Sequence, residues 1–397
     1  MTSEWRTIRI ADFIDFNPRL SLKKGAIVTK VAMDKLKPFT KKIPETEKAE
    51  FNGGAKFCNG DTVMARITPC LENGKTAYVD MLDDGEIGFG STEFIVMRAK
   101  TGISDPQFVY YTAINPIFRN VAIKSMVGSS GRQRVQQSVL EELELSVPNL
   151  DEQRRIGAFL AGLDEKIALN NRINDNLMQQ AVTIFKSWFV EYSPFDGIEP
   201  KEWETINLEK ITSLISRGIA PKYSDNSDQI VINQKCIRNH MIDLSQARTH
   251  TPKVINEKWL RFGDLLINST GDGTLGRAAQ VWFQPQNITV DSHVTVVRPA
   301  KENLIFYIGL WGVLHEKEIE SLHTGSTGQT ELPKERVKAL ELHLPDNGTL
   351  DRFNTLIAPM AAAIVSKQNE NNKLATLRDA LLPKLMSGEI DVSAVQL

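Results

Sequence analysis

Two long stretches of the chain carry apolar residues at three- and four-residue steps, the pattern of helices that bury one stripe. The first runs from 151 to 189, contains no proline and keeps heptad spacing. At 1.5 Å per residue it predicts a helix about 55–60 Å long. The second, from 350 to about 387, contains Pro359 and Pro383. We therefore expect the second helix to be kinked or shorter.

The stretches before each helix have a different pattern, with short apolar runs separated by Gly, Pro and Asn turn signals. They cover roughly residues 1–148 and 200–345. Strand-like runs lie at 62–65, 94–97, 265–267 and 294–297, and helical stretches are expected around 106–124 and 302–321. This mixture predicts an α+β fold.

The second half of the chain repeats the first in order and at a nearly constant offset. The sequence EWRTI at 4–8 returns as EWETI at 202–206, GSSG at 128–131 as GSTG at 325–328, and NNRI at 170–173 as NNKL at 371–374. Such a tandem duplication predicts two similar domains related by a pseudo-two-fold axis. Because duplex DNA has the same symmetry, DNA is a candidate ligand.

Neither long helix can bury its apolar stripe alone, and each carries asparagine near mid-stripe, where it fixes register in coiled coils. Matched lengths and the two-fold predict an antiparallel pair. The alternative is that each helix packs on its own globular domain. The predicted seam consists of Ile156, Leu160, Leu163, Ile167, Asn170, Asn174, Leu177, Ile184, Trp188, Ile357, Met360, Ile364, Asn371, Leu374 and Leu381.

We therefore predict a tandem-duplicated α+β protein in which a long antiparallel two-helix coiled coil separates two mixed α/β domains. The predicted segments are 1–148 for the first globular domain, 149–192 for the first helix, 193–347 for the second globular domain, and 348–397 for the second helix and tail.

Composition narrows the class of protein. The three cysteines, Cys58, Cys70 and Cys236, lack zinc-ligand spacing, and their odd number does not suit a set of disulfides. No apolar run approaches the roughly 20 residues that span a bilayer. We therefore expect a cytoplasmic protein. A net charge of −2 argues against charge-driven, non-specific binding of nucleic acid. Lysine and arginine nevertheless gather at matching places in the two copies, 19–48 and 210–261, which favours DNA binding.

Motifs for chemistry are weak. The Gly-x-Gly-x-x-Gly at 271–276 would bind a dinucleotide only if a helix opened there, but the following residues are typical of a strand, so a hairpin turn is expected. The Asn-Pro-Ile-Phe at 115–118 only approaches the amino-methyltransferase signature. The six histidines show no zinc spacing. These patterns argue against a self-sufficient enzyme.

Several motifs resemble those of one known family. The sequence VPNLDEQRRI at 147–156, leading into a helix that ends IFKSWFV at 184–190, resembles the central conserved region of type I restriction–modification specificity subunits. The segment LRDALLPKLMSGEI at 377–390 resembles their distal conserved region, and the glycine-rich loops are also similar. The resemblance covers essentially the whole chain. One departure is LDRF at 350–353, where the first copy has LDEQ.

The resemblance implies a non-catalytic subunit. In that family, each of two target-recognition domains reads half of a split sequence in double-stranded DNA, while the helix pair sets the spacer and docks two methyltransferase (M) subunits. The M subunits use S-adenosylmethionine to methylate adenine N6, and motor–nuclease (R) subunits add ATP- and Mg-dependent translocation and cleavage. The specificity chain itself is expected to bind no cofactor and no metal.

Arginine suits guanine edges, asparagine and glutamine suit adenine, and lysine suits phosphates. On these grounds the candidate DNA contacts are Lys23, Lys24, Arg66, Lys75, Ser129, Ser130, Arg132, Arg134, Arg217, Lys222, Tyr223, Arg277, Ser326, Thr327 and Gln329. For the glycine-rich loops the alternative is a plain turn. Two other functions stay open: a stand-alone or orphan DNA-binding protein, and an enzyme whose chain alone binds a cofactor.

Overall fold

The computed structural model describes residues 5–129, 131–252, 254–325 and 330–392. The chain forms two compact units, Met1–Asn170 with Glu370–Leu397 (unit 1) and Asn171–Asn369 (unit 2). Each long helix is thus divided between the two units. Among the described residues, no helix is long and apolar enough to cross a bilayer.

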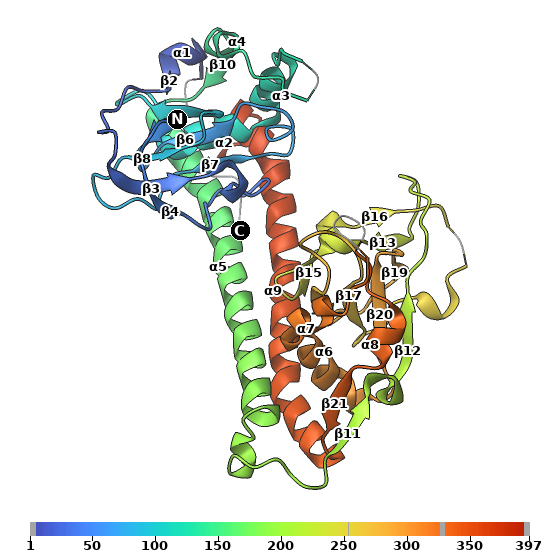
Figure 1. Ribbon diagram of the computed structural model, residues 1–397. Coiled ribbons are helices and arrows are strands. Elements are labelled where there is room, and N and C mark those ends of the chain that lie inside the picture. The colour runs from blue at the N-terminus through green and yellow to red at the C-terminus, as the bar shows by residue number, and fades with distance from the viewer. Residues whose placement is uncertain (1–4, 130, 253, 326–329, 393–397) are drawn as a thin grey trace. The chain divides into compact units, whose positions relative to one another are not determined.

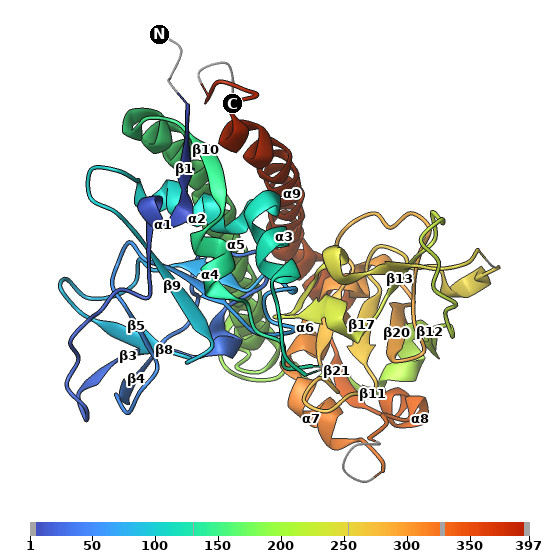
Figure 2. The same ribbon diagram turned by 90° about the horizontal axis from the view of Figure 1, so that it is seen from above.

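Unit 1 contains two four-stranded sheets (Figures 1 and 2). The first is antiparallel, in the order β2 (Ile14–Phe16), β9 (Phe94–Ala99), β6 (Thr62–Ala65) and β7 (Thr76–Tyr78). The second has the order β4 (Glu47–Glu50), β3 (Ile27–Val31), β8 (Gly88–Gly90) and β5 (Ala55–Phe57), with β3 parallel to β8. The remaining elements are the pair β1 (Arg6–Arg9) and β10 (Glu144–Val147), α1 (Ile10–Phe13), η1 (Met33–Lys35), α2 (Pro106–Ile114), α3 (Pro116–Lys124) and α4 (Gln137–Glu141).

Unit 2 repeats the antiparallel sheet of unit 1 and three of the four strands of its second sheet. Its antiparallel sheet has the order β12 (Thr212–Arg217), β20 (Val294–Pro299), β17 (Leu265–Asn268) and β18 (Ala278–Gln280). A second sheet has the order β16 (Arg248–Thr249), β13 (Ile230–Ile232) and β19 (Ile288–Val290), with β13 parallel to β19. The other strands are the pairs β11 (Glu204–Asn207) with β21 (Glu341–Leu344) and β14 (Ile237–Arg238) with β15 (Met241–Ile242). The predicted strand runs at 62–65, 94–97, 265–267 and 294–297 are confirmed.

The helices of unit 2 follow the same order as those of unit 1. They are α6 (Ile305–Leu314), α7 (Glu316–Ser321) and α8 (Lys334–Lys338), with the short helices η2 (Ser193–Phe195), η3 (Leu208–Ile211), η4 (Gln234–Cys236), η5 (Leu244–Gln246), η6 (Asn256–Lys258) and η7 (Glu302–Leu304). The predicted helical stretches around 106–124 and 302–321 correspond to α2–α3 and to η7, α6 and α7.

The two long helices are α5 (Leu150–Phe189) and α9 (Asn347–Ser387). They pair antiparallel within each unit. In unit 1 Asn170 Nδ2 donates to Asn371 Oδ1 at 2.9 Å. In unit 2 the rings of Phe185 and Phe353 lie 6.0 Å apart. Of the two predicted outcomes for the second helix, kinked or shorter, the second was wrong, because α9 has 41 residues and α5 has 40.

Pro359 lies within α9 without ending it. Its missing N–H leaves the Thr355 carbonyl without a helical partner. Pro359 and Thr355 are both exposed, and an unpaired carbonyl costs less in such a place than in the core, so the helix continues.

The predicted seam residues differ in burial. Ile156, Leu160, Leu163, Asn170, Asn174, Ile357 and Ile364 are buried, whereas Ile167, Leu177, Ile184, Trp188, Met360, Asn371, Leu374 and Leu381 are partly buried. Ile156 and Leu160 share a core with Phe108 of α2, and Ile357 shares one with Tyr307 of α6. The helix segments therefore pack on each other and also on a globular domain, so the two packing alternatives coexist.

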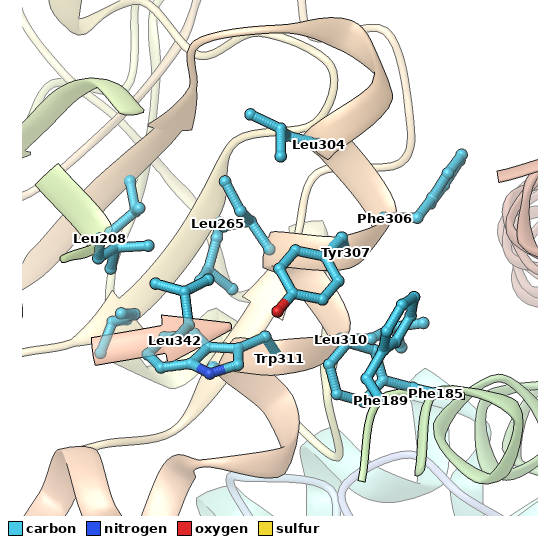
Figure 3. Packing of buried hydrophobic residues seen from close by; sticks show 14 of the residues in the cluster. Phe185, Phe189, Leu208, Leu265, Leu304, Phe306, Tyr307, Leu310, Trp311 and Leu342 are labelled. Atoms are coloured by element: carbon cyan, nitrogen blue, oxygen red, sulfur yellow. The ribbon is translucent and has the colours of Figure 1, made fainter. Parts of the chain in front are cut away.

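Aromatic rings join the helices to the sheet domain in unit 2 (Figure 3). Phe189 of α5 lies 4.9 Å from Tyr307 and 4.8 Å from Phe353, measured between ring centroids. The ring of Trp203 lies 5.7 Å from that of Phe189. Since full burial of one such side chain contributes about 1.5–3 kcal/mol, this cluster is a principal source of stability for the unit.

Candidate nucleic-acid interface

Two loops meet beyond the end of β6 in unit 1. Thr68 N donates to Gln133 O at 3.0 Å, and Val135 N donates to Arg66 O at 2.9 Å. Val127 and Arg134 exchange backbone hydrogen bonds of 3.0 and 2.8 Å, which closes the glycine-rich loop as a hairpin. A side chain at Gly128 would meet the Arg132 carbonyl at 2.9 Å, so the tight turn requires glycine there. We call loops 66–75 and 125–136 the first loop pair.

Unit 2 contains an equivalent second loop pair, 268–277 and 322–333. Leu332 N donates to Ser269 O at 2.8 Å, and Thr324 and Glu331 exchange backbone hydrogen bonds of 2.8 and 2.9 Å. The backbone construction therefore repeats that of unit 1, with Glu331 at the position of Arg134. The candidates Ser326, Thr327 and Gln329, and Ser130 in the first loop pair, lie outside the described residues.

Ion pairs anchor the two loop pairs with opposite polarity. In unit 1 the Arg134 guanidinium donates to both carboxylate oxygens of Glu93 at 2.6–3.0 Å. This hydrogen bonding lowers the pKa of Glu93. In unit 2 the carboxylate belongs to the loop, because Glu331 pairs with Arg217 of β12 at 2.5 Å. One backbone arrangement thus presents opposite charges in the two copies.

Other predicted cations hold the loops to the protein's own carbonyls. Lys75 Nζ donates to Met33 O at 2.9 Å, Arg277 Nη2 to Gly273 O at 2.8 Å, and Arg66 Nη2 to Val135 O at 3.5 Å. A group used in this way has fewer donors left for a ligand. The structure therefore gives these three residues a role in shaping the loops.

A second group of candidates is exposed. Lys23, Lys24, Ser129, Arg132 and Lys222 all expose their side chains. Tyr223 is 38% exposed and contacts an arginine that sequence reasoning missed, Arg248. Nothing in the local sequence distinguishes Arg248, because its contact depends on a pairing of distant segments.

Sequence reasoning also missed a contact beside each loop pair. Phe39 is 59% exposed with φ of 53°, and the Arg119 guanidinium lies 5.1 Å from its ring. In unit 2 His240, with φ of 61°, pairs with Glu316 at 3.2 Å. The nearly constant offset between the two copies is the sequence signal that relates the position of Phe39 to that of His240.

The motifs considered for chemistry are structural. Gly271–Gly276 lies in the turn between antiparallel β17 and β18, as expected for a hairpin. Asn115 caps α3, where its side chain accepts from Ile117 N at 2.9 Å. Within the described part of the chain, no three His, Cys, Asp or Glu side chains gather as they would around a metal ion.

Comparison with known proteins identifies the family. The family model of the type I restriction modification DNA specificity domain matches residues 2–179 and again residues 200–358. The chain belongs to this family and carries two of its domains in tandem. The resemblance found in the sequence and the tandem-duplicated α+β fold are thereby confirmed.

Relatives span most of the chain. The type I restriction enzyme MjaIX specificity subunit of Methanocaldococcus jannaschii is 27% identical over 297 residues, which cover 68% of this chain and 66% of that protein, just under two thirds. The HindI specificity subunit of Haemophilus influenzae is 22% identical over 406 residues, covering 83% and 86%. The crystal structure of a type I S subunit from M. genitalium has a TM-score of 0.54 at 15% identity and covers 96% of each chain, which indicates a shared fold.

Proposed function

We propose that this chain is the DNA-recognition subunit of a type I restriction–modification complex, with each globular domain reading one half of a split double-stranded target. The observation that carries this proposal is the repeated loop pair. The described backbone hydrogen bonds that join its loops are equivalent in both units, but Arg134 pairs with Glu93 in one and Glu331 with Arg217 in the other. Two different half-sites read from one scaffold require this combination of constant backbone and altered side chains.

The proposed division of labour leaves catalysis to partner subunits. Two M subunits methylate adenine N6 with S-adenosylmethionine, and R subunits use ATP and Mg for translocation and cleavage. The specificity chain acts in the cytoplasm, binds none of these cofactors, and provides binding energy and geometry. The glycine-rich stretch that most resembled a nucleotide site is a hairpin turn, which supports this assignment.

We assign docking of the M subunits and the spacing of the half-sites to the helix pair. A rigid spacer suits half-sites about one helical turn of DNA apart. Apolar side chains remain exposed on both helices: Leu169 at 43%, Leu356 at 44% and Leu377 at 38%. Exposed leucines on a long helix suit contact with another protein.

The test is co-expression of the chain with the M subunit of its host, followed by sequencing of N6-methyladenine in the host DNA. The expected result is one split motif that is methylated only when this chain is present. The control pairs the same M subunit with another specificity subunit known to activate it. No new methylation beside an active control would contradict the proposal and would lead to the alternative, a stand-alone DNA-binding protein, tested by binding of the chain alone.

A further inference from the structure

An exposed arginine lies flat on an exposed tyrosine in unit 2. The segment 222–224 runs antiparallel to 249–251, with Ser224 N donating to Thr249 O at 3.2 Å and Thr251 N to Lys222 O at 2.8 Å. This pairing brings the Arg248 guanidinium to 3.6 Å from the centroid of the Tyr223 ring. At this distance the planar guanidinium stacks on the ring face.

The stack fixes Arg248 while leaving its donors available. Among the described residues no carboxylate pairs with Arg248, and its side chain is exposed. A free arginine side chain loses rotamer entropy when it binds a ligand. Stacking restricts the side chain beforehand and covers one face of the guanidinium, while the side chain as a whole stays exposed.

The first copy treats the corresponding position differently. In unit 1 Lys30 of β3 lies opposite Glu47 of β4, and the two form an ion pair of 2.7 Å. In unit 2 the matching strands are β13 and β16, where Val231 lies opposite Arg248. The parallel strand pairs show that Lys30 and Val231 are equivalent. Lys30 precedes Val31, which lies opposite Gly90, and Val231 precedes Ile232, which lies opposite Val290. The duplicated position is therefore Glu47 in unit 1, where Lys30 neutralises it, and Arg248 in unit 2, where no described carboxylate pairs with it.

A series of contacts connects the stack to the second loop pair. Arg248 lies opposite Val231 of β13, and Val231 lies opposite Thr289 of β19, two residues before Asp291. Asp291 Oδ1 accepts from His293 N at 2.9 Å, and His293 Nδ1 lies 2.8 Å from Thr270 Oγ1. Thr270 belongs to the second loop pair, where it forms a bridge with Glu331. Arg248 therefore lies within the same structural neighbourhood as the candidate interface.

We propose that Arg248, held on Tyr223, reads a guanine in the half-site bound by the second domain. Two N–H groups on one edge of a guanidinium match the O6 and N7 acceptors that guanine presents in the major groove. This inference rests on the proposed function and adds to it a specificity-determining residue and the base that it reads.

The experiment sequences N6-methyladenine in cells that express the M subunit with wild-type or variant chain. In the Arg248→Ala variant one guanine position of one half-site should become degenerate, with discrimination there falling about 5- to 150-fold. The other half-site should be unchanged. Arg248→Gln should move the preference at that position towards adenine, because glutamine pairs with the N6 and N7 groups of adenine. Tyr223→Phe keeps the ring and should keep the motif.

Glu47→Ala, at the matched position of the first copy, is the control and should leave the motif unchanged. Co-purification of each variant with the M subunit shows that it folds. An unchanged motif in both Arg248 variants overturns the inference while leaving the proposed function intact. Uniformly weaker methylation at all sites, with every base still discriminated, assigns Arg248 to phosphate and also overturns it. Absence of methylation with the wild-type chain sinks the proposed function together with this inference.

Discussion

Arg378 of α9 donates a hydrogen bond of 2.6 Å to Asp164 of α5, and both side chains are buried. The second oxygen of Asp164 accepts from the Tyr111 hydroxyl at 2.6 Å, so the ion pair joins both helices to α2. Counted from the matching residues Asn170 and Asn371, the corresponding positions in unit 2 are Leu177 and Val365. The buried ion pair of unit 1 therefore corresponds to two apolar side chains in unit 2.

Breaking this ion pair should strongly destabilise unit 1. Asp164→Val removes the partner of the buried Arg378 charge on α5 and leaves it only the exposed Asp379 carboxylate at 2.8 Å, so we expect the free energy of unfolding to fall by about 3 kcal/mol. The combined Asp164→Val, Arg378→Leu and Tyr111→Phe variant copies the apolar chemistry of unit 2 and should recover most of that loss. Urea denaturation followed by circular dichroism measures both. A triple variant less stable than Asp164→Val alone would contradict the account.

The aromatic cluster of unit 2 should respond to truncation. Phe353 is fully buried, with its ring 4.8 Å from that of Phe189. Phe353→Ala is expected to lower the free energy of unfolding by about 3–5 kcal/mol through lost burial and the cavity left behind. Leu356→Ala, three residues along the same helix and exposed, should change it by less than about 0.5 kcal/mol. Thermal or urea unfolding of the two variants provides the comparison; equal effects would argue against the packing.

Each loop anchor should affect one half-site only. Arg134→Ala releases the first loop pair from Glu93, and Arg217→Ala releases the second from Glu331. We expect each variant to weaken discrimination in one half of the split motif and to leave the other half unchanged, as measured by methylome sequencing. Loss of discrimination in the same half-site by both variants would show that the loop pairs do not serve separate half-sites.

The stability of unit 1 should contain an acid-dependent contribution from Glu86. Burial raises the pKa of this carboxyl, but hydrogen bonds from Lys48 and from Thr29 N, each 2.8 Å, more than offset that effect and bring it to about 2. Because the folded-state pKa is below the ordinary 4.5, the contribution is complete above about pH 5 and is lost as the pH falls towards 2.

This contribution is about 2 kcal/mol once solvent screening is allowed for. Glu86→Gln should therefore be less stable than the wild type at pH 7, and the difference should shrink between pH 5 and pH 2. Urea denaturation across this pH range measures the difference. A difference that stays constant with pH would contradict the assignment.

The architecture could be predicted because the apolar periodicity of a helix is a local signal and because the second half of the sequence repeats the first. The long helices follow from apolar spacing, and the partnership of Asn170 with Asn371 follows from their equivalent places in the two copies. Pro359 did not end the helix, because it and Thr355 are both exposed, where an unpaired carbonyl costs less than in the core.

The candidate interface was less predictable because it depends on long-range partners. A residue far along the chain decides whether an arginine is available to a ligand. Arg134 forms an ion pair with Glu93 and Arg217 with Glu331, whereas Arg248 stacks on Tyr223. Local sequence offers no sign of these partners. The repeat offset helps only partly, since it relates Arg134 to Glu331 but does not identify the partner of either.

The division of α5 and α9 between the units has a consequence for synthesis on the ribosome. Unit 2 is one continuous stretch, Asn171–Asn369, whereas the core of unit 1 includes Leu382, Leu385 and Met386 from the far end of α9. The first unit therefore cannot complete its core until nearly all of the chain has been synthesised. Until then the apolar surface of the portion translated first stays open to chaperones and to aggregation.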